Sequence, residues 1–343
     1  MKGGEKGMNY IGMDIHKQFT VAVVKDREGN ELETEKFDNS KENFQKFLKI
    51  YKPEETDIVM ESTSVWEPIY DIIEDLKYHV KLANPVKTRA IAEARIKTDK
   101  VDASTLCDLL RANLVAESYI PSKEVRELRD IVRARKSLVQ GKTKIKNKIR
   151  AILIKTGIKL PYKTLCKNSM AFIVEEIEKK HFSMKTIVSC NINLLEQYNF
   201  EVKKIDDKLT EIALKDNRVQ LLKTIPGIGN IIAITLIAEI GDINRFESSQ
   251  KLSSYAGLVP GIRQSGNTLK VGRLIKQSSK DLKTCLIEAS WVLVRTKEAS
   301  RFKWFFGNLS KKKGKQKAIC AVARKLCCVV YAMLKKNQTF MLL

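Results

Sequence analysis

Residues 97–103 read Lys97-Thr98-Asp99-Lys100-Val101-Asp102-Ala103 and open a stretch whose next apolar residues are Leu106, Leu109 and Leu110. This spacing predicts a helix with Asp99 and Asp102 on one face of its first turn. The helix dipole favours acids there anyway, so the pair alone carries little functional weight. Asp14 and Glu61 lie within or at the end of apolar, strand-like runs, where an uncompensated carboxylate is costly. We therefore expect the four acids to converge and to need a cation.

The first 120 residues are predicted to follow the order βββαβαβα. The expected strands are 9–15, 19–26, 31–37, 57–60 and 78–83, and the expected helices are 41–51, 66–77 and 85–95, with Ser40 capping the first helix. This is the ribonuclease-H-like order, in which the first and fourth strands are neighbours and the last helix packs across their ends. There the four acids would hold two Mg²⁺ ions about 4 Å apart. Considered alone, each residue has an alternative without metal that is as probable as metal binding: Asp14 is then a strand-end or turn acid, and Glu61 a solvated rim residue.

Charge is distributed unevenly along the chain. The net charge is −4 for residues 1–120 (18 basic, 22 acidic), +10 for 121–160 (13 and 3), +1 for 161–260 (13 and 12) and +16 for 261–343 (19 and 3). An acidic N-terminal module joined to strongly basic segments is typical of a metal-dependent nucleic-acid enzyme, in which acids gather metal and basic residues bind phosphate.

Composition excludes several other classes. The 343 residues are 43% hydrophobic, as in ordinary globular proteins, and no apolar run predicts a signal peptide or a membrane span. Seven cysteines without a CxxC pair and only three histidines indicate neither a zinc site nor a disulfide framework. We therefore expect a soluble cytoplasmic protein with two or three domains.

Residues 121–217 are predicted to be helical. An apolar stripe of Ile145, Ile149 and Ile152 is followed by a second apolar pattern, from Leu195 to Ile212, with the three-and-four spacing of a coiled-coil seam. The seam indicates a helical hairpin or a dimer contact without choosing between them. The residues flanking the stripe either bind nucleic-acid backbone or form a solvated face; they are Lys142, Lys144, Lys146, Lys148 and Arg150.

Residues 218–343 contain two glycine-rich segments and a basic tail. The turn Ile225-Pro226-Gly227-Ile228-Gly229 precedes an apolar helix, so Gly227 and Gly229 either present N–H groups to phosphate, as in a helix-hairpin-helix element, or pack internally. Ser265 lies in a basic, Gly-flanked segment that begins at Arg263 and is expected to be flexible, so Ser265 is either a turn serine or a nucleophile. A nucleophilic serine needs a base or a metal, and no histidine follows His181.

The basic tail begins near three aromatic residues. Lys311, Lys312 and Lys313 either contact phosphate or form a solvated loop before the apolar helix 319–334. The aromatic residues could stack on bases, although core packing is the commoner role for such residues. They are Trp304, Phe305 and Phe306.

These motifs together resemble the insertion-sequence one-ten family of DEDD transposases, which are related to the Piv DNA invertase. The resemblance spans nearly the whole chain and rests on Asp14, Glu61, residues 97–103, the Ile225–Gly229 turn, Ala238-Glu239-Ile240-Gly241-Asp242, Tyr255-Ala256-Gly257-Leu258-Val259-Pro260 and Gln264-Ser265-Gly266. One stretch departs from the family pattern: Lys276-Gln277-Ser278-Ser279-Lys280 lacks the glycine usual there, which puts the local backbone in question.

The resemblance implies a RuvC-like domain over residues 1–120, a coiled-coil linker and dimerisation region over 121–217, and a mainly helical transposase domain over 218–343. Asp14, Glu61, Asp99 and Asp102 would bind Mg²⁺, and Ser265 would form a covalent phosphoserine link to DNA. The partners would be donor and target DNA and a structured noncoding bridge RNA, with a dimer assembling into a tetramer in the bacterial or archaeal nucleoid.

Two other functions stay open. A nuclease like a Holliday-junction resolvase would use the four acids alone, with Ser265 merely structural. A non-catalytic nucleic-acid packaging protein would need neither the acids nor Mg²⁺. The sequence has no GxxxxGK[ST] nucleotide-binding loop. This agrees with a recombinase, because a covalent protein–DNA link conserves the energy of the phosphodiester bond and strand exchange then needs no ATP.

Overall fold

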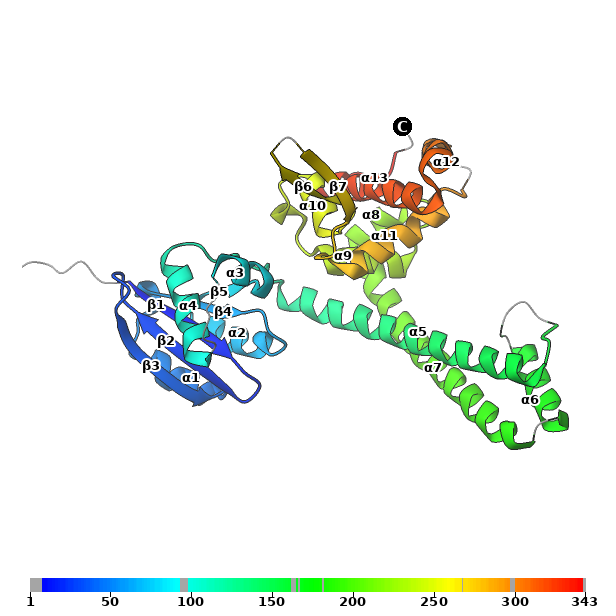
Figure 1. Ribbon diagram of the computed structural model, residues 1–343, viewed down its shortest axis with the longest axis horizontal. Coiled ribbons are helices and arrows are strands. Elements are labelled where there is room, and N and C mark those ends of the chain that lie inside the picture. The colour runs from blue at the N-terminus through cyan, green and yellow to red at the C-terminus, as the bar shows by residue number, and fades with distance from the viewer. Residues whose placement is uncertain are drawn as a thin grey trace, which may run out of the picture. The chain divides into compact units, whose positions relative to one another are not determined.

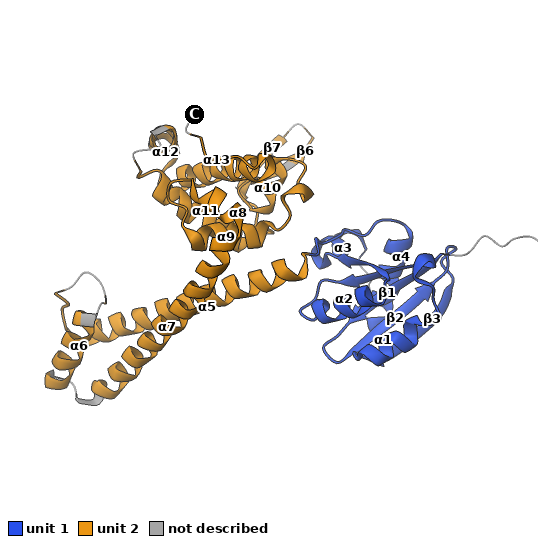
Figure 2. Ribbon diagram, turned by 180° about the vertical axis from the view of Figure 1, so that it is seen from behind, with its two compact units in different colours: residues 1–120 blue, residues 121–343 orange. Residues whose placement is uncertain are grey.

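The computed structural model describes residues 8–92, 98–161, 165, 167–180, 182–266, 268–296 and 300–341. The chain divides into two compact units, residues 1–120 and residues 121–343 (Figure 2). None of the helices in these ranges has the length and apolar character needed to cross a lipid bilayer.

The first unit is built on a five-stranded mixed sheet in the order β3-β2-β1-β4-β5 (Figure 1). Its meander consists of β1 (Asn9–Ile15), β2 (Phe19–Lys25) and β3 (Glu31–Asp38), all antiparallel. β4 (Thr56–Glu61) pairs parallel with β1, and β5 (His79–Ala83) pairs parallel with β4. The predicted strand order is confirmed, and so is the pairing of the first strand with the fourth.

The two faces of this sheet have different cores because side chains alternate across each strand. α1 (Lys41–Leu48) and α2 (Trp66–Asp75) cover one face, which buries Ile11 and Met13 of β1. α4 (Asp99–Arg111) covers the other through Ala103, Leu106 and Leu110. Ser40 caps α1 as predicted, by accepting a hydrogen bond from the Asn43 N–H.

The predicted helix 85–95 is wrong at its end. α3 (Pro85–Ile91) stops where Ala92 takes an extended conformation. The rest of the predicted helix, residues 93–95, lies outside the described residues, and so do residues 96 and 97, the second of which is Lys97 of the stretch 97–103. Thr98 then caps α4 by accepting a hydrogen bond from the Val101 N–H at 3.2 Å, so the helix begins at the predicted acid.

The second unit begins with a long helical hairpin of α5 (Lys123–Thr156), α6 (Lys167–Lys180) and α7 (Phe182–Lys215). The predicted seam residue Leu195 packs with Ile145 and Ile149 of α5, so the seam closes this hairpin within one chain. A Cβ built on Gly141 of α5 would lie 2.6 Å from the Tyr198 ring, so the two helices touch closely there. α5 ends at Gly157, whose φ of 66° is left-handed, as expected for a glycine at a helix C-terminus.

The rest of the second unit is mainly helical, as predicted, and its core includes Leu209 of α7 and Val132 of α5. Its elements are α8 (Asn217–Lys223), α9 (Asn230–Ile240), α10 (Ser249–Tyr255), β6 (Pro260–Ser265), β7 (Thr268–Leu274), α11 (Lys280–Leu293), α12 (Ser300–Lys313) and α13 (Lys315–Lys336). A short 3₁₀ helix also occurs in each unit, at Pro53–Glu55 in the first and at Ile243–Arg245 in the second.

The segment around Ser265, expected to be flexible, forms a hairpin in which Ser265 lies beside the turn. β6 and β7 form an antiparallel hairpin in which Ser265 is paired with Thr268. Gly266 has a φ of 53°, the left-handed conformation that a two-residue hairpin turn requires. Ile262 and Gln264 lie on the same face of β6 but differ in polarity, so this stretch has no apolar–polar alternation from which a strand could be predicted.

Candidate active site

α4 lies directly on β1, and a glycine makes this possible. A Cβ at Gly12 would lie 2.1 Å from the Ala103 carbonyl oxygen and 2.6 Å from the Cys107 backbone nitrogen. The Cys107 thiol donates to the Tyr10 carbonyl oxygen at 3.0 Å, and burial raises the pKa of this thiol to about 11. This backbone contact sets the first turn of α4 beside the end of β1.

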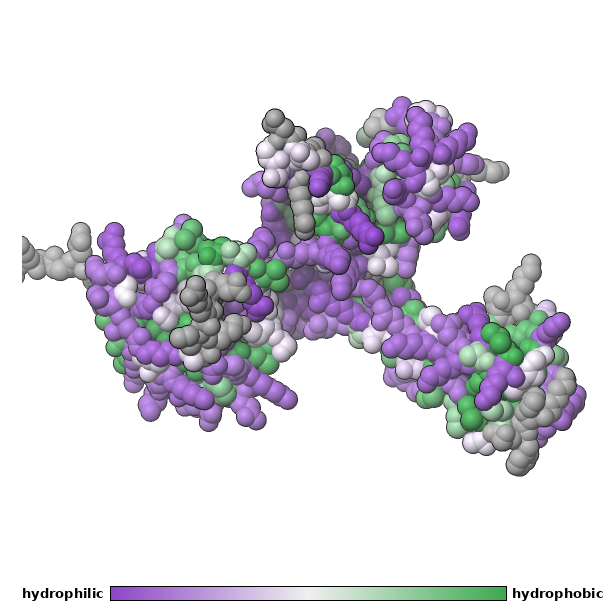
Figure 3. All heavy atoms as spheres, in the orientation of Figure 1, coloured by the Kyte–Doolittle hydropathy of each residue, from purple (hydrophilic) through white to green (hydrophobic). Residues whose placement is uncertain are grey.

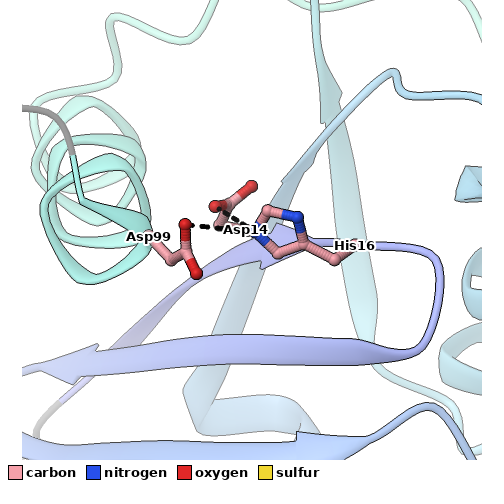
Figure 4. A group of neighbouring side chains, drawn as sticks. All are labelled: Asp14, His16 and Asp99. Atoms are coloured by element: carbon pink, nitrogen blue, oxygen red, sulfur yellow. Dashed lines mark hydrogen bonds and ion pairs between the residues drawn. The ribbon is translucent and has the colours of Figure 1, made fainter.

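The contact brings acids and a histidine together. The Nε2 atom of His16 lies 3.1 Å from Asp14 Oδ2 and 3.3 Å from Asp99 Oδ1 (Figure 4). Asp14 comes from the end of β1, Asp99 from the first residue of α4, and His16 from the residue after β1. One ligand atom from each side chain falls within 4.8 Å of the other two, which is close enough to share one cation.

The electrostatics of Asp14 extend this group to Asp102. Burial raises the pKa of Asp14, and the negative charges of Asp102 and Asp99 raise it as well, while the neighbouring His16 lowers it. Like charges held together resist ionisation unless a positive charge compensates them. Partly buried carboxylates whose mutual repulsion His16 offsets only in part suit a hard divalent cation, which prefers oxygen ligands. The residues present therefore fit a divalent metal.

Glu61 lies on the same side of the sheet as Asp14. The paired residues Met13 and Met60 both point into the α1–α2 core, so the next residue on each strand points to the α4 face. Glu61 is half-buried and ends β4. Among the described residues, however, the set of three within 4.8 Å contains Asp14, His16 and Asp99, without Glu61 or Asp102.

His16 is the site residue that reasoning from the sequence missed. Three histidines were too few for a zinc site, so none was considered as a ligand. The available signal was an acid and a histidine two residues apart at the end of an apolar strand, a spacing that puts both side chains on one face. An imidazole nitrogen beside carboxylates also accepts Mn²⁺ and other transition metals, so the donor set is wider than four acids.

Ser265 belongs to the second unit and has different surroundings. Its side chain is exposed, and its hydroxyl has no hydrogen-bond partner among the described residues. A hydroxyl in this setting is accessible, and no base in the described part of its own unit is hydrogen-bonded to it to activate it.

The base of the hairpin that carries Ser265 is firmly anchored. The Ile275 N–H donates to the Val259 carbonyl at 3.1 Å, and the Ser279 N–H donates to the Tyr255 carbonyl at 3.0 Å. A Cβ at Gly257, whose φ is +67°, would lie 2.3 Å from the Ser278 hydroxyl. Ser279 caps α11, so the stretch 276–280, whose backbone was in question, ends in an ordinary helix N-terminus.

A buried carboxylate ties this base to α5. Glu239 is only 1% exposed and accepts bonds from Arg133 Nε at 3.1 Å, Arg133 Nη2 at 3.3 Å and the Ser279 hydroxyl at 2.9 Å. Arg129 donates to the Ala238 and Glu239 carbonyls at 2.7 and 3.0 Å. Glu239 belongs to one of the motifs on which the family resemblance rests, but its sequence context indicated no role for it.

The predicted nucleic-acid-binding residues have varied surroundings. On α5, Lys144, Lys148 and Arg150 are exposed opposite the buried Ile145 and Ile149. Lys142 and Lys146 are half-buried, and burial, with a smaller effect of Lys146, lowers the pKa of Lys142. Lys311, Lys312 and Lys313 are exposed at the end of α12, so they belong to a helix and not to a loop.

The two glycines of the predicted phosphate-binding turn differ. A Cβ at Gly227 would lie 2.8 Å from the Val292 side chain, so this glycine packs internally. Gly229 borders open space and precedes α9 without a side-chain cap, so its part of the turn is accessible. Arg263 lies in β6, and its side chain is outside the described residues.

Both units of the chain match known transposase sequences. Residues 11–158 match a family model of DEDD transposases, and residues 219–305 match the model of the IS116/IS110/IS902 transposase family. The transposase for insertion sequence element IS1328 of Yersinia enterocolitica is 25% identical over 96% of this chain and 98% of its own length. The pilin gene-inverting protein of Moraxella bovis is 26% identical over 96% and 97% of the two chains.

A third relative, the transposase for element IS1111A of Coxiella burnetii, is 24% identical over 82% of this chain and 79% of its own length. The matched models lie in both units, and the relatives align across the junction between them. The chain therefore belongs to the IS116/IS110/IS902 family of transposases and is a DNA transposase or recombinase.

Proposed function

We propose that this transposase cuts and exchanges DNA strands at a divalent-metal site of Asp14, Glu61, Asp99 and Asp102, with Ser265 as the nucleophile. The observation that carries the proposal is the meeting of Asp14, His16 and Asp99 within 4.8 Å on the α4 face, where burial, together with the charges of Asp102 and Asp99, raises the pKa of Asp14. The strand order and this position of the acids support a RuvC-like, ribonuclease-H-like assignment for residues 1–120.

The chemistry follows from the side chains. A bound Mg²⁺ pair supplies positive charge that lowers the pKa of a serine hydroxyl and stabilises the leaving oxygen. The Ser265 Oγ attacks the phosphorus, the bond from phosphorus to one deoxyribose oxygen breaks, and that oxygen takes up a proton as the serine loses one. The resulting phosphoserine diester is attacked by the hydroxyl of another strand, which restores Ser265 and joins the new strands. One phosphodiester bond forms for each one broken, so the reaction needs no energy from ATP.

The remaining parts of the chain suit nucleic-acid partners. The +10 and +16 segments would hold donor DNA, target DNA and a structured bridge RNA that selects them. The helical hairpin keeps apolar side chains exposed, among them Ile187 and Leu194, which are one heptad apart on α7. We propose that this face joins two chains, and that dimers assemble into a tetramer on the nucleoid.

Trapping of the protein–DNA adduct tests the serine. The wild-type protein, incubated with Mg²⁺, its copurifying RNA and nicked donor DNA, is expected to give a denaturant-resistant adduct whose peptide mass places the phosphate on Ser265. Ser265→Ala abolishes adduct and strand exchange, and the matched control Thr268→Ala, which removes the hydroxyl opposite it in the hairpin, keeps both. Metal-dependent cutting by Ser265→Ala at the wild-type rate would instead establish the nuclease.

Two further results test the packaging function and the guide RNA. If Asp102→Asn and removal of Mg²⁺ leave every activity unchanged, the protein is a non-catalytic binder.

Sequencing of the RNA that copurifies with the protein tests the guide: one structured species, encoded beside the gene, is expected. A mixture of cellular RNAs would overturn the guided reaction without affecting the metal or serine chemistry.

A further inference from the structure

α12 has one aromatic side chain that does not join the core. Phe305 and Phe306 turn inward: the Phe305 ring lies 3.9 Å from Lys325 Nζ, and the Phe306 ring packs against Trp291 at 5.6 Å. Trp304, between them and Lys303 in sequence, is 70% exposed. Tryptophan is enriched at interfaces with partners because its ring is apolar and its N–H is polar.

The residues around Trp304 define the chemistry of that partner. Helical spacing puts Arg301, Asn308 and Lys311 on the same side of α12 as Trp304, and all four side chains are exposed. The surface over α12 is mostly hydrophilic in the space-filling view (Figure 3). Residues 300–341 contain eleven lysines and arginines and no acidic residue. A protein partner or a second copy of this chain would need a concentrated acidic surface, whereas a phosphate backbone supplies negative charge at every step.

A glycine leaves room beside the indole ring. Gly307 lies one helical turn after Trp304, and a Cβ built there would meet nothing within 4 Å. Packing therefore does not require glycine, although glycine in a helix interior costs about 1 kcal/mol relative to alanine. The missing side chain leaves that side of the indole ring open to a flat group.

We infer that the α12 stripe, defined as Arg301, Trp304, Asn308 and Lys311, binds an unpaired nucleotide, with the base stacked on Trp304 and the flanking phosphates on Arg301 and Lys311. Stacking on an aromatic side chain is independent of base identity, and it is inaccessible to a base inside a duplex. The stripe would therefore hold single-stranded or looped DNA or RNA. The inference does not depend on the metal or serine chemistry proposed above.

Binding assays on the full-length protein in EDTA, with no metal for cutting, test this. The probes are labelled (dT)20, (rU)20, a 20-unit abasic deoxyribose strand and a blunt 20-base-pair duplex. Trp304→Ala is expected to weaken binding of the strands that carry bases by about tenfold, because removing one stacked base contact has an effect of that order. Affinity for the abasic strand and the duplex stays unchanged, and Trp304→Phe restores most of the loss.

The control variant is Phe200→Ala, which removes another exposed aromatic, on α7, from beside Lys204. It is expected to bind all four probes like the wild type. A loss confined to (rU)20 assigns the stripe to RNA, a loss confined to (dT)20 assigns it to DNA, and either upholds stacking. The inference fails if Trp304→Ala binds (dT)20 and (rU)20 as tightly as the wild type, or loses the abasic strand equally.

Discussion

Asp14 and Asp99 are held where backbone packs against backbone, whereas Ser265 lies beside the turn of a two-stranded hairpin with its side chain exposed. At Gly12 there is no room for a methyl group between β1 and α4, so the carboxylates have little freedom to separate. Groups of like charge must be fixed by the fold, because their own interaction drives them apart. A neutral hydroxyl experiences no such repulsion, and only the base of its hairpin needs to be fixed.

The two regions also differ in what fixes them. The acids depend on close packing around Gly12, while the hairpin base depends on the hydrogen bonds of Glu239 with Arg133 and Ser279. Damage to one region should therefore leave the other intact. The following substitutions test this difference.

Asp102→Asn should have the largest effect of the substitutions in the acidic region. Removing one of the proposed metal-binding charges is expected to slow strand cleavage in Mg²⁺ by about 10³-fold, since a lost metal contact removes several kcal/mol of transition-state stabilisation. Rates of cleavage of labelled donor DNA measure it. The control, Asp75→Asn on α2, makes the same change at a side chain that is 68% exposed on the other face of the sheet, and should cut normally.

Gly12→Ala should destabilise the first unit by about 3 kcal/mol, the upper end of the cost of overpacking, because the added methyl meets backbone atoms that cannot rotate away. Urea unfolding followed by Trp66, the only tryptophan of this unit, measures the loss. Cys107 should also react faster with thiol reagents as α4 loosens. Gly229→Ala, where a Cβ meets only open space, is the matched control. Equal stability of the two variants would show that α4 can shift freely.

Glu239→Ala should destabilise the second unit by about 2 kcal/mol, less than for a fully buried ion pair, because Arg133 is 51% exposed and can be hydrated. Trp291 and Trp304 report this unit, and the unfolding of Trp66 should not change. The control is Glu211→Ala, which removes a carboxylate that is 66% exposed and paired with Lys208. If Glu239→Ala also loses adduct formation while binding DNA with normal affinity, the result would show that Glu239 supports the Ser265 hairpin and not DNA binding.

Sequence patterns predicted the first unit better than the serine region. Apolar runs identified the strands, and the spacing of Asp99 and Asp102 located the start of α4. His16 was missed because a single histidine carries no periodic signal, and its role appears only when α4 packs on β1. The β6–β7 hairpin was missed because Gly261, Gly266 and Gly272 suggest a loop. Cross-strand pairing that no local pattern encodes makes strands of the residues on either side of Gly266.

Asp14→Asn should have the smallest and most informative effect, on the stability of the metal-free protein. Because the folded state raises the pKa of Asp14, the charged carboxylate is disfavoured on folding once the pH exceeds the ordinary value of 3.8. In EDTA at pH 7 the variant should therefore need more urea to unfold than the wild type, and this advantage should vanish as the pH falls and the wild-type carboxyl takes up its proton. Added Mg²⁺ should reverse the order, because the wild type, with all four acids, gains more binding energy from the ion than the variant. Asp75→Asn should show neither the pH-dependent gain nor the reversal. A variant less stable than the wild type in EDTA at pH 7 would mean that His16 outweighs burial and the repulsion from Asp99 and Asp102, and that the acids are not poised for a cation.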